Sequence, residues 1–344
     1  MSASPLPPSA FGRPLYPEDR DQGDPYILAL PPQAGARFRY YVYTTGENPR
    51  TGRAFPVYGS DDLLTWHPLG DALTMVRGGA HWAPCVRYIP NLDLPYVMLY
   101  SRSIGLGEQA HIGHAIYRAH SANPEGPFVD SGHVLTPDLD FAIDPDVYRL
   151  PDGSLKLAFA TDFVADEPYG TGIVEVAIND DLTALQSAPR LLARASHSWQ
   201  VFEPARVMPW KQIPGIDWTR DTVRWHTIEA PVGGLVSPTG QTVYLYSGGC
   251  FYNFYAVGAL IEDHHGALQD VSHGDGAFVI GPDPARGFYA PGHCSWLHVA
   301  PKLDYLMLHA RFGSPTAPRQ MCLARLGWTA GGHPYAGGIR SSEF

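Results

Sequence analysis

The stretch AIDPDVYRLPDGSLKLAFA, residues 142–160, contains two short apolar segments separated by a turn. An Asp-Pro pair opens the first segment, and Pro-Asp-Gly-Ser stands before the second, LKLAFA. Runs of this length, rich in β-branched and aromatic residues and bounded by turn residues, are typical of strands. The stretch therefore predicts a pair of consecutive strands, with Asp144 near the start of the first.

The same arrangement, a short proline-marked strand followed by an apolar strand, occurs at five places. They are DPYIL at 24, WAPCVRYI at 82, DPDVYRL at 144, EAPVGGLV at 229 and APGHCSWLHV at 290. The intervals between Asp24, Trp82, Asp144, Glu229 and His293 are 58, 62, 85 and 64 residues, enough for four strands and their loops. Long stretches with helical periodicity are absent from the sequence. The repeat predicts an all-β fold, a five-bladed β-propeller.

One interval of the repeat is longer than the others. Its additional segment, residues 186–228, carries four tryptophans, and we interpret it as an insertion between the third and fourth blades rather than a linker. We therefore expect residues 1–344 to form a single propeller domain. If any segment is disordered, we expect it to be the lead of residues 1–20 or the tail of residues 336–344.

Composition and charge exclude several classes of protein. The chain of 344 residues is 44% hydrophobic and 17% charged, so bulk disorder is excluded. A net charge of -10 offers no basic field for a phosphate backbone, so we expect no nucleic-acid partner. No apolar run is long enough to cross a bilayer, and the first residues lack a signal-peptide pattern. We expect no membrane association and a cytoplasmic protein, with secretion through an atypical or removed signal as the alternative; the sequence carries no signal for an oligomeric state.

Three carboxylates mark the starts of predicted inner strands. In a propeller the first strand of each blade lies closest to the axis, so Asp24, Asp144 and Glu229 are predicted to converge there. Carboxylates crowded in a partly desolvated funnel raise one another's pKa, so that one stays protonated while another is ionised. This combination of an acid and a base is what glycoside hydrolysis requires. For any single Asp-Pro pair the alternative is a structural turn, as at Asp283-Pro284.

Two further carboxylates compete for these roles. Glu203, in VFEPARV, is the alternative to Glu229, but no apolar strand like TVYLYSGG follows it. Asp146 is the alternative to Asp144 and is predicted to lie on the same face of the strand at a different depth. We therefore favour Glu229 and Asp144.

Three motifs carry a resemblance to glycoside hydrolase family 43. They are GDPYIL (23–28), AIDPDVYRLPDGSLKLAFA (142–160) and HTIEAPVGGLVSPTGQTVYLYSGG (226–249). The chain resembles this family of five-bladed propellers over roughly residues 24–335. The resemblance implies that Asp24 is the general base, Asp144 the modulator of the acid's pKa and Glu229 the general acid. Ala230 stands where the family usually has glycine.

The resemblance also implies an axial ion. A blade-5 histidine of the family reaches the axis and often binds Ca²⁺ or Na⁺ through a water-rich shell, and His293 is the matching residue. Calcium prefers oxygen ligands, so one imidazole would hold the ion weakly. The alternative for His293 is a satisfied core histidine. No organic cofactor is expected.

Three side chains are predicted to contact the substrate. Trp82, at a blade start, and Phe251, after the fourth-blade strand, offer aromatic faces of the kind that stack on sugar rings. Arg311 and Arg319 could each present a guanidinium to sugar hydroxyls, although a surface ion pair is the commoner fate of an arginine. Of the two, Arg311 is favoured because it ends a predicted inner-strand motif.

Together these features predict an inverting exo-glycosidase of the β-xylosidase and α-L-arabinofuranosidase type. It would release terminal β-D-xylosyl or α-L-arabinofuranosyl residues from plant-derived oligosaccharides, as in xylan degradation. The alternatives are a propeller glycosidase of galactosidase, arabinanase or fructosidase type, and a catalytically silent carbohydrate-binding propeller.

Overall fold

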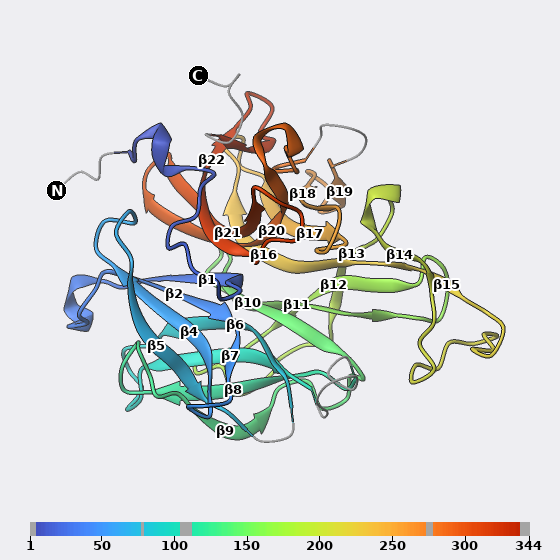
Figure 1. The fold of residues 1–344 in the computed structure, drawn as a ribbon, viewed down its shortest axis with the longest axis horizontal. Helices are drawn as coiled ribbons and strands as arrows, with labels where there is room; N and C mark the ends of the chain where they lie inside the picture. The colour runs from blue at the N-terminus through green and yellow to red at the C-terminus, as the bar shows by residue number, and fades with distance from the viewer. Residues whose placement is uncertain (1–4, 77–78, 104–111, 273–277, 338–344) are drawn as a thin grey trace.

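The computed structural model describes residues 5–76, 79–103, 112–272 and 278–337. Within these residues it contains five sheets of mainly antiparallel strands, arranged around a central axis (Figure 1). The chain completes each sheet before it begins the next, so each sheet is one blade. The all-β, five-bladed propeller predicted from the sequence repeat is therefore confirmed. None of the helices in this described part is long and apolar enough to cross a membrane.

Each blade begins with its innermost strand. Blade 1 contains β1 (Gly23–Ala29), β2 (Tyr40–Thr45), β3 (Glu47–Asn48), β4 (Arg53–Ser60) and β5 (His67–Thr74). Blade 2 contains β6 (His81–Tyr88), β7 (Tyr96–Arg102), β8 (Ala115–Ser121) and β9 (Val129–Val134). Blade 3 contains β10 (Ala142–Arg149), β11 (Leu155–Phe163), β12 (Gly170–Ala177) and β13 (Arg190–Arg194), extended by β14 (Val201–Arg206) and β15 (Val223–His226). Blade 4 contains β16 (Ile228–Val236), β17 (Thr242–Gly249), β18 (Tyr255–Glu262) and β19 (Leu268–Asp270). Blade 5 contains β20 (Phe288–Ala300), β21 (Leu303–Phe312), β22 (Gln320–Trp328) and β23 (Pro334–Gly337). The described 3₁₀ turns are η1 (Pro8–Ala10), η2 (Pro32–Ala34), η4 (Ser198–Gln200) and η5 (Pro284–Arg286).

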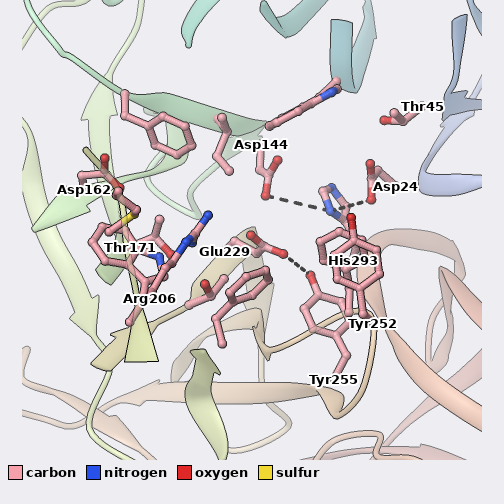
Figure 2. A pocket seen from close by; sticks show the side chains of 18 of the residues that line it. Asp24, Thr45, Asp144, Asp162, Thr171, Arg206, Glu229, Tyr252, Tyr255 and His293 are labelled. Carbon is pink, nitrogen blue, oxygen red and sulfur yellow. Dashed lines mark hydrogen bonds and ion pairs between the residues drawn. The ribbon is translucent and has the colours of Figure 1, made fainter. Parts of the chain in front are cut away.

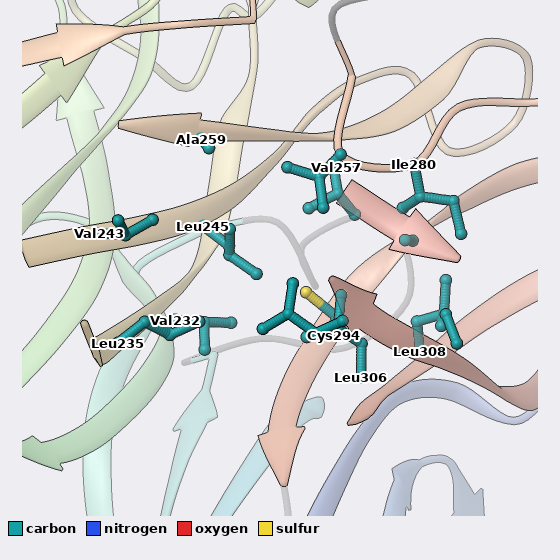
Figure 3. Close-up of a cluster of buried hydrophobic side chains, with 14 of the residues drawn as sticks. Val232, Leu235, Val243, Leu245, Val257, Ala259, Ile280, Cys294, Leu306 and Leu308 are labelled. Atoms are coloured by element: carbon teal, nitrogen blue, oxygen red, sulfur yellow. The ribbon is translucent and has the colours of Figure 1, made fainter. Parts of the chain in front are cut away.

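The core lies between the blades. Successive residues of a strand point to opposite faces of its sheet, so each strand serves two interfaces. In β2, Tyr40 and Val42 pack between blades 5 and 1, whereas Tyr41 and Tyr43 pack between blades 1 and 2. Each of the five interfaces has its own buried cluster, and Figure 3 shows the one between blades 4 and 5. The inner strands also contact one another around the ring, including β20 against β1, so every blade start is held near the axis.

A left-handed residue precedes a proline in every inner strand. These residues have φ angles between 45° and 59° and are Asp24, Ala83, Asp144, Ala230 and Ala290. The pairing register shifts at each of them, so each lies in a β-bulge. Asp24 and Asp144 occupy equivalent bulge positions, whereas Glu229 stands one residue before its bulge and His293 three residues after. The repeat found in the sequence is therefore structural, but its five marker residues are not at one structural position.

The insertion is shorter than predicted. Residues 190–194 form β13, which pairs with β12 as the outer strand of blade 3, so the insertion proper is 195–227. Within it β14 and β15 pair with each other, and His226 joins Gly170 at the edge of β12. Its apolar residues, among them Met208 and Trp225, form a separate small cluster. The insertion thus has a core of its own and is fixed to blade 3.

Residues 5–20 of the N-terminal lead pack against blades 5 and 1. Phe11 is buried in the cluster between blades 5 and 1, and the backbone N–H of Gly12 donates to the Leu323 carbonyl at 3.0 Å. The N–H of Leu15 donates to the Met321 carbonyl at 3.0 Å. Burial of Phe11 and these hydrogen bonds offset the entropy of ordering the segment. At the other end, residues 336 and 337 belong to β23, and 338–344 lie outside the described residues.

Replacement of Ala230 by glycine tests the bulge at the start of blade 4. Ala230 has φ 50° and is buried, so its Cβ bears a left-handed penalty of about 1 kcal/mol that glycine lacks. We expect Ala230→Gly to leave the free energy of unfolding unchanged or raise it by up to about 1 kcal/mol, because the unfolded-state entropy of glycine offsets part of the gain.

The matched control is Ala158→Gly, in the buried part of β11, where no positive φ relieves the cost. There we expect a loss of about 1 kcal/mol or more from added backbone entropy and a lost methyl contact. Equal losses in the two variants, measured by denaturant unfolding, would contradict the strained-bulge interpretation.

Candidate active site

The predicted carboxylates Asp24, Asp144 and Glu229 line one pocket of about 460 Å³ (Figure 2). Asp24 comes from β1, Asp144 from β10 and Glu229 from β16, so three different blades supply them. The rest of the lining comes from all five blades and from the insertion. The predicted convergence at the axis is therefore present in the structure.

Asp24 is held as an anion. Its Oδ1 lies 3.0 Å from Nη1 of Arg319 and 3.1 Å from Nδ1 of His293. Burial raises the pKa of the Asp24 carboxyl, but the opposite charge of Arg319, with smaller effects of His293 and His309, lowers that pKa well below its ordinary value. Burial in turn lowers the pKa of both imidazoles, so Arg319 is the permanent cation beside Asp24 at neutral pH.

Arg319 is fixed by a second carboxylate and by a glycine. Its Nε and Nη2 donate to Oδ2 of Asp21 at 2.8 and 2.6 Å, and its backbone N–H donates to Oδ1 of Asp21 at 2.7 Å. A Cβ on Gly23 would lie 2.0 Å from Cζ of Arg319, so only glycine leaves room for the guanidinium. The glycine of the GDPYIL motif therefore leaves the space that the Arg319 guanidinium occupies.

The structure does not place Arg311, the favoured arginine, in the lining of the pocket. Its guanidinium donates to the carbonyl of Ala317 instead. Arg319, the alternative that the sequence ranked second, lines the pocket and contacts Asp24. The two arginines belong to different segments: Arg311 extends from β21, whereas Arg319 stands just before β22 and its guanidinium lies against Gly23 of β1.

Glu229 has the opposite electrostatic environment. Burial raises the pKa of its carboxyl to about 7, a hydrogen bond donated by the Tyr255 hydroxyl to Oε1 at 2.6 Å opposes the rise, and the charge of Asp24 adds to it. Arg319, which stabilises the Asp24 anion directly, acts on Glu229 only as a weaker lowering influence. Glu229 is therefore partly protonated at neutral pH.

Asp144 lies beside both of the other carboxylates. Its Oδ2 accepts a hydrogen bond from the backbone N–H of Ala230 at 3.1 Å, and its own N–H donates to Oγ of Ser101 at 3.0 Å. Burial, followed by the charges of Glu229 and Asp24, raises the pKa of Asp144 well above its ordinary value. Carboxyls that raise one another's pKa titrate as a pair, so Asp144 is placed to influence Glu229.

His293 lies between two of the carboxylates, as Figure 2 shows. Its Nδ1 is 3.1 Å from Oδ1 of Asp24 and 3.9 Å from Oδ2 of Asp144. Across the described ranges no group of three His, Cys, Asp or Glu residues could hold a metal ion, and Nδ1 of His293 is engaged by Asp24. The donor set calcium prefers is therefore not assembled there by the protein alone. The axial Ca²⁺ or Na⁺ stays a prediction, and no catalytic step is derived through it.

The competing carboxylates lie elsewhere. The side chain of Glu203 is 47% exposed and pairs with Arg206 of the insertion rather than lining the pocket. Asp146 faces a small cavity on the other side of the bulges, where it accepts hydrogen bonds from the Tyr26 hydroxyl at 3.4 Å and the Gly233 N–H at 3.0 Å. Asp146 does not line the pocket that holds Asp144 and Glu229.

The predicted aromatic contacts both line the pocket. Trp82 stacks on His114 with 4.0 Å between ring centroids, and Phe251 lies under the guanidinium of Arg319 at 5.4 Å. The sequence analysis did not single out Tyr255, or Arg206, Trp210 and Lys211 of the insertion, which also line the pocket. The four tryptophans of the segment 186–228 were the available signal, because a surface insertion has little reason to be so aromatic.

The arrangement can perform acid and base chemistry at one pH. One carboxylate is held ionised by an arginine, and another keeps a proton near neutral pH because it is buried. Pairs of carboxyls whose environments push their pKa values apart are the usual means of assigning an acid and a base in one site.

Comparisons with known proteins agree with this site. The family model described as "Glycosyl hydrolases family 43" matches residues 24–334. A search of curated proteins found no match. Among solved structures, a thermostable family-43 glycoside hydrolase is 23% identical with a TM-score of 0.68, covering 94% of this chain and 95% of that one.

Two further structures show the same fold. An endo-1,4-beta-xylanase from Bacteroides thetaiotaomicron is 21% identical with a TM-score of 0.67, covering 92% of this chain and 94% of that one. An alpha-L-arabinofuranosidase from Lactobacillus brevis is 17% identical with a TM-score of 0.65, covering 91% and 93%. Since the family model spans most of the sequence and the pocket holds the carboxylates of the family motifs, the chain belongs to glycoside hydrolase family 43.

Proposed function

We propose that this glycoside hydrolase is an inverting, exo-acting enzyme that releases terminal β-D-xylosyl or α-L-arabinofuranosyl residues from oligosaccharides. The observation that carries the proposal is that Asp24, paired with the Arg319 guanidinium, and Glu229, hydrogen-bonded by the neutral Tyr255 hydroxyl, line one pocket. The insertion 195–227 supports exo action because it builds one wall of the pocket. Similar folds described as a xylanase and an arabinofuranosidase support a pentose in the substrate.

In the proposed mechanism, Asp24 is the general base. Ionised beside Arg319, it accepts a proton from the water that attacks the anomeric carbon. Glu229 is the general acid and gives its proton to the glycosidic oxygen as the bond to the leaving group breaks. The carboxyls of Asp144 and Glu229 titrate as a coupled pair. Asp144 thereby raises the pKa of Glu229 and keeps the acid protonated. Trp82 and Phe251 offer aromatic faces to the terminal sugar.

Turnover of a panel of 4-nitrophenyl glycosides tests the proposal. We expect hydrolysis of the β-D-xyloside or the α-L-arabinofuranoside, and the first product seen by proton NMR should have inverted configuration. On xylo- or arabino-oligosaccharides the monosaccharide should appear first. Turnover of galactosides or fructosides alone would contradict the proposed substrate. A product of retained configuration would refute the inverting mechanism. No turnover of any glycoside would favour a catalytically silent carbohydrate-binding propeller.

Substitution of the two main carboxyls should separate the acid from the base. Glu229→Gln removes the proton donor, so substrates with a poor leaving group should lose about 10² to 10⁴ in rate, whereas activated aryl glycosides should lose less. Asp24→Asn removes the base, so both kinds of substrate should be affected alike.

Kinetics with a natural disaccharide and an aryl glycoside of the same sugar give the comparison. The matched control is Glu203→Gln, a carboxyl-to-amide change outside the pocket, which should leave both rates close to wild type. If Glu203→Gln, rather than Glu229→Gln, showed the leaving-group dependence, the assignment of the acid would be wrong.

The pH profile should reflect the two pKa shifts. The pKa of Glu229 is raised to about 7, so kcat/KM should fall as pH rises through about 7 and the acid loses its proton. The pKa of Asp24 is lowered, so the acidic limb should lie below its ordinary 3.8. In Arg319→Gln the effect of burial on the pKa of Asp24 loses its largest opposing influence, so the acidic limb of the residual activity should move to higher pH.

Asp144→Asn should act on the other limb. Without a second carboxyl in the pair, the pKa of Glu229 should fall and the alkaline limb should move to lower pH.

Arg311→Gln, which removes a guanidinium outside the pocket, is the matched control for Arg319→Gln. An acidic limb at the same pH in Arg319→Gln and wild type would show that Arg319 does not hold Asp24 ionised.

A further inference from the structure

The insertion contributes a distinct side of the pocket. Figure 2 shows Arg206, with Asp162 and Thr171, on one side, and Asp24 with His293 on the other, with Glu229 and Asp144 between them. In an inverting reaction the base and its water lie on one face of the sugar, and the acid meets the leaving group on the opposite face. The side chains on the far side of Glu229 from Asp24, where Arg206 lies, therefore face the leaving group.

Arg206 lies in this wall with its hydrogen-bonding capacity unused by the protein. Its side chain is only 20% exposed, and its guanidinium lies 4.9 Å from the Phe202 ring centroid and 5.6 Å from that of Trp225. Its polar neighbour is Glu203, whose Oε2 is 3.7 Å from Nε, beyond hydrogen-bond distance. Among the described residues no acceptor takes a hydrogen bond from this guanidinium. None of its nitrogens is among the fully buried polar atoms that lack a partner, so the guanidinium can donate to an acceptor on a ligand in the pocket.

Two aromatic side chains are exposed at the same pocket. Trp210 of the insertion is 41% exposed and Tyr252 of the β17–β18 turn is 63% exposed, and both line the pocket. Within the described part of the chain they are the only tryptophan, tyrosine or phenylalanine among the exposed large hydrophobic residues. Figure 2 shows Tyr252 on the side of Asp24 and His293, so Trp210, which belongs to the insertion, is the exposed aromatic face that suits the apolar face of a second sugar ring.

The wall is close to neutral in charge. Arg206 has Glu203 as its neighbour, and Lys211 forms an ion pair with Asp162, which also lines the pocket. Each cation of the wall is thus matched by a carboxylate, and the wall presents donors and acceptors rather than a net charge. Hydroxyl groups of a neutral sugar fit this pattern better than a carboxylate would.

We infer that the insertion 195–227 forms a leaving-group subsite that binds a neutral sugar ring. The ring stacks on Trp210, and Arg206 donates hydrogen bonds to its oxygens. The inference rests on the proposed glycosidase function and adds to it: the preferred substrates are oligosaccharides, and Arg206 determines this preference by contact with the leaving group. The small core around Met208 and Trp225 holds the wall in place before the substrate binds.

A comparison of two leaving groups tests this subsite. We would measure kcat/KM for β-D-xylosyl fluoride, whose leaving group is one atom, and for 1,4-β-xylobiose, or for the corresponding arabinofuranosyl pair. In Arg206→Gln the ratio of disaccharide to fluoride should fall about ten-fold, the size of one or two lost hydrogen bonds. In Trp210→Ala the ratio should fall several-fold through lost stacking.

Arg220→Gln is the matched control, because Arg220 lies in the same insertion, is 74% exposed and does not line the pocket. Its ratio should equal that of wild type. Thermal unfolding of each variant checks the fold. Arg206→Lys is a second variant, which keeps the positive charge but loses the planar guanidinium. Its ratio of disaccharide to fluoride should also fall. Ratios unchanged in Arg206→Gln and Trp210→Ala would overturn the subsite, whereas wild type inactive on both substrates would refute the proposed function instead.

Discussion

A residue held at positive φ before a proline begins the bulge of each inner strand, and the active site depends on this bulge. At Asp24 and Asp144 the bulge residue is itself a carboxylate. At blade 4 the bulge residue is Ala230, and Glu229 precedes it. The conformation is costly for residues other than glycine, and it persists because the packed blade interfaces hold the strands on both sides. The core between blades and the chemistry at the axis are therefore linked through the same short segments.

Burial alone would leave three carboxyls protonated together and provide no base. The arginine at position 319 removes this symmetry, because its guanidinium lies 3.0 Å from Asp24 and is itself fixed by Asp21. Glu229 instead accepts a hydrogen bond from a neutral phenol, which lowers its pKa less than burial raises it. One charged neighbour thus decides which carboxyl is the base. The site needs Gly23 for the same reason, since a side chain there would displace the guanidinium.

The fold and the three carboxylates could be predicted from the sequence, because each bulge residue is followed by a proline. The Asp-Pro and Ala-Pro pairs gave the number of blades and identified Asp24 and Asp144, and the strand after Glu229 separated it from Glu203. Arg319 was named as a candidate, but its pairing with Asp24 could not be predicted in this way, since it depends on a contact between β22 and β1 at opposite ends of the chain. The packing of the N-terminal lead could not be predicted for the same reason, because Phe11 is buried by strands about 300 residues later in the chain. The wall made by the insertion was also missed, because nothing local in the sequence shows that Arg206 faces the pocket.

The central claim is that Asp24 is ionised while Glu229 keeps a proton. Carbon-13 NMR of protein labelled at the side-chain carboxyls of Asp and Glu measures this directly, with signals assigned by comparison with Asp24→Asn and Glu229→Gln. The account predicts that the Glu229 signal titrates with a midpoint near 7, while the Asp24 signal stays that of a carboxylate down to pH values below 3.8. A Glu229 signal that titrates near its ordinary 4.5, or an Asp24 carboxyl that takes up its proton at higher pH than Glu229, would contradict it.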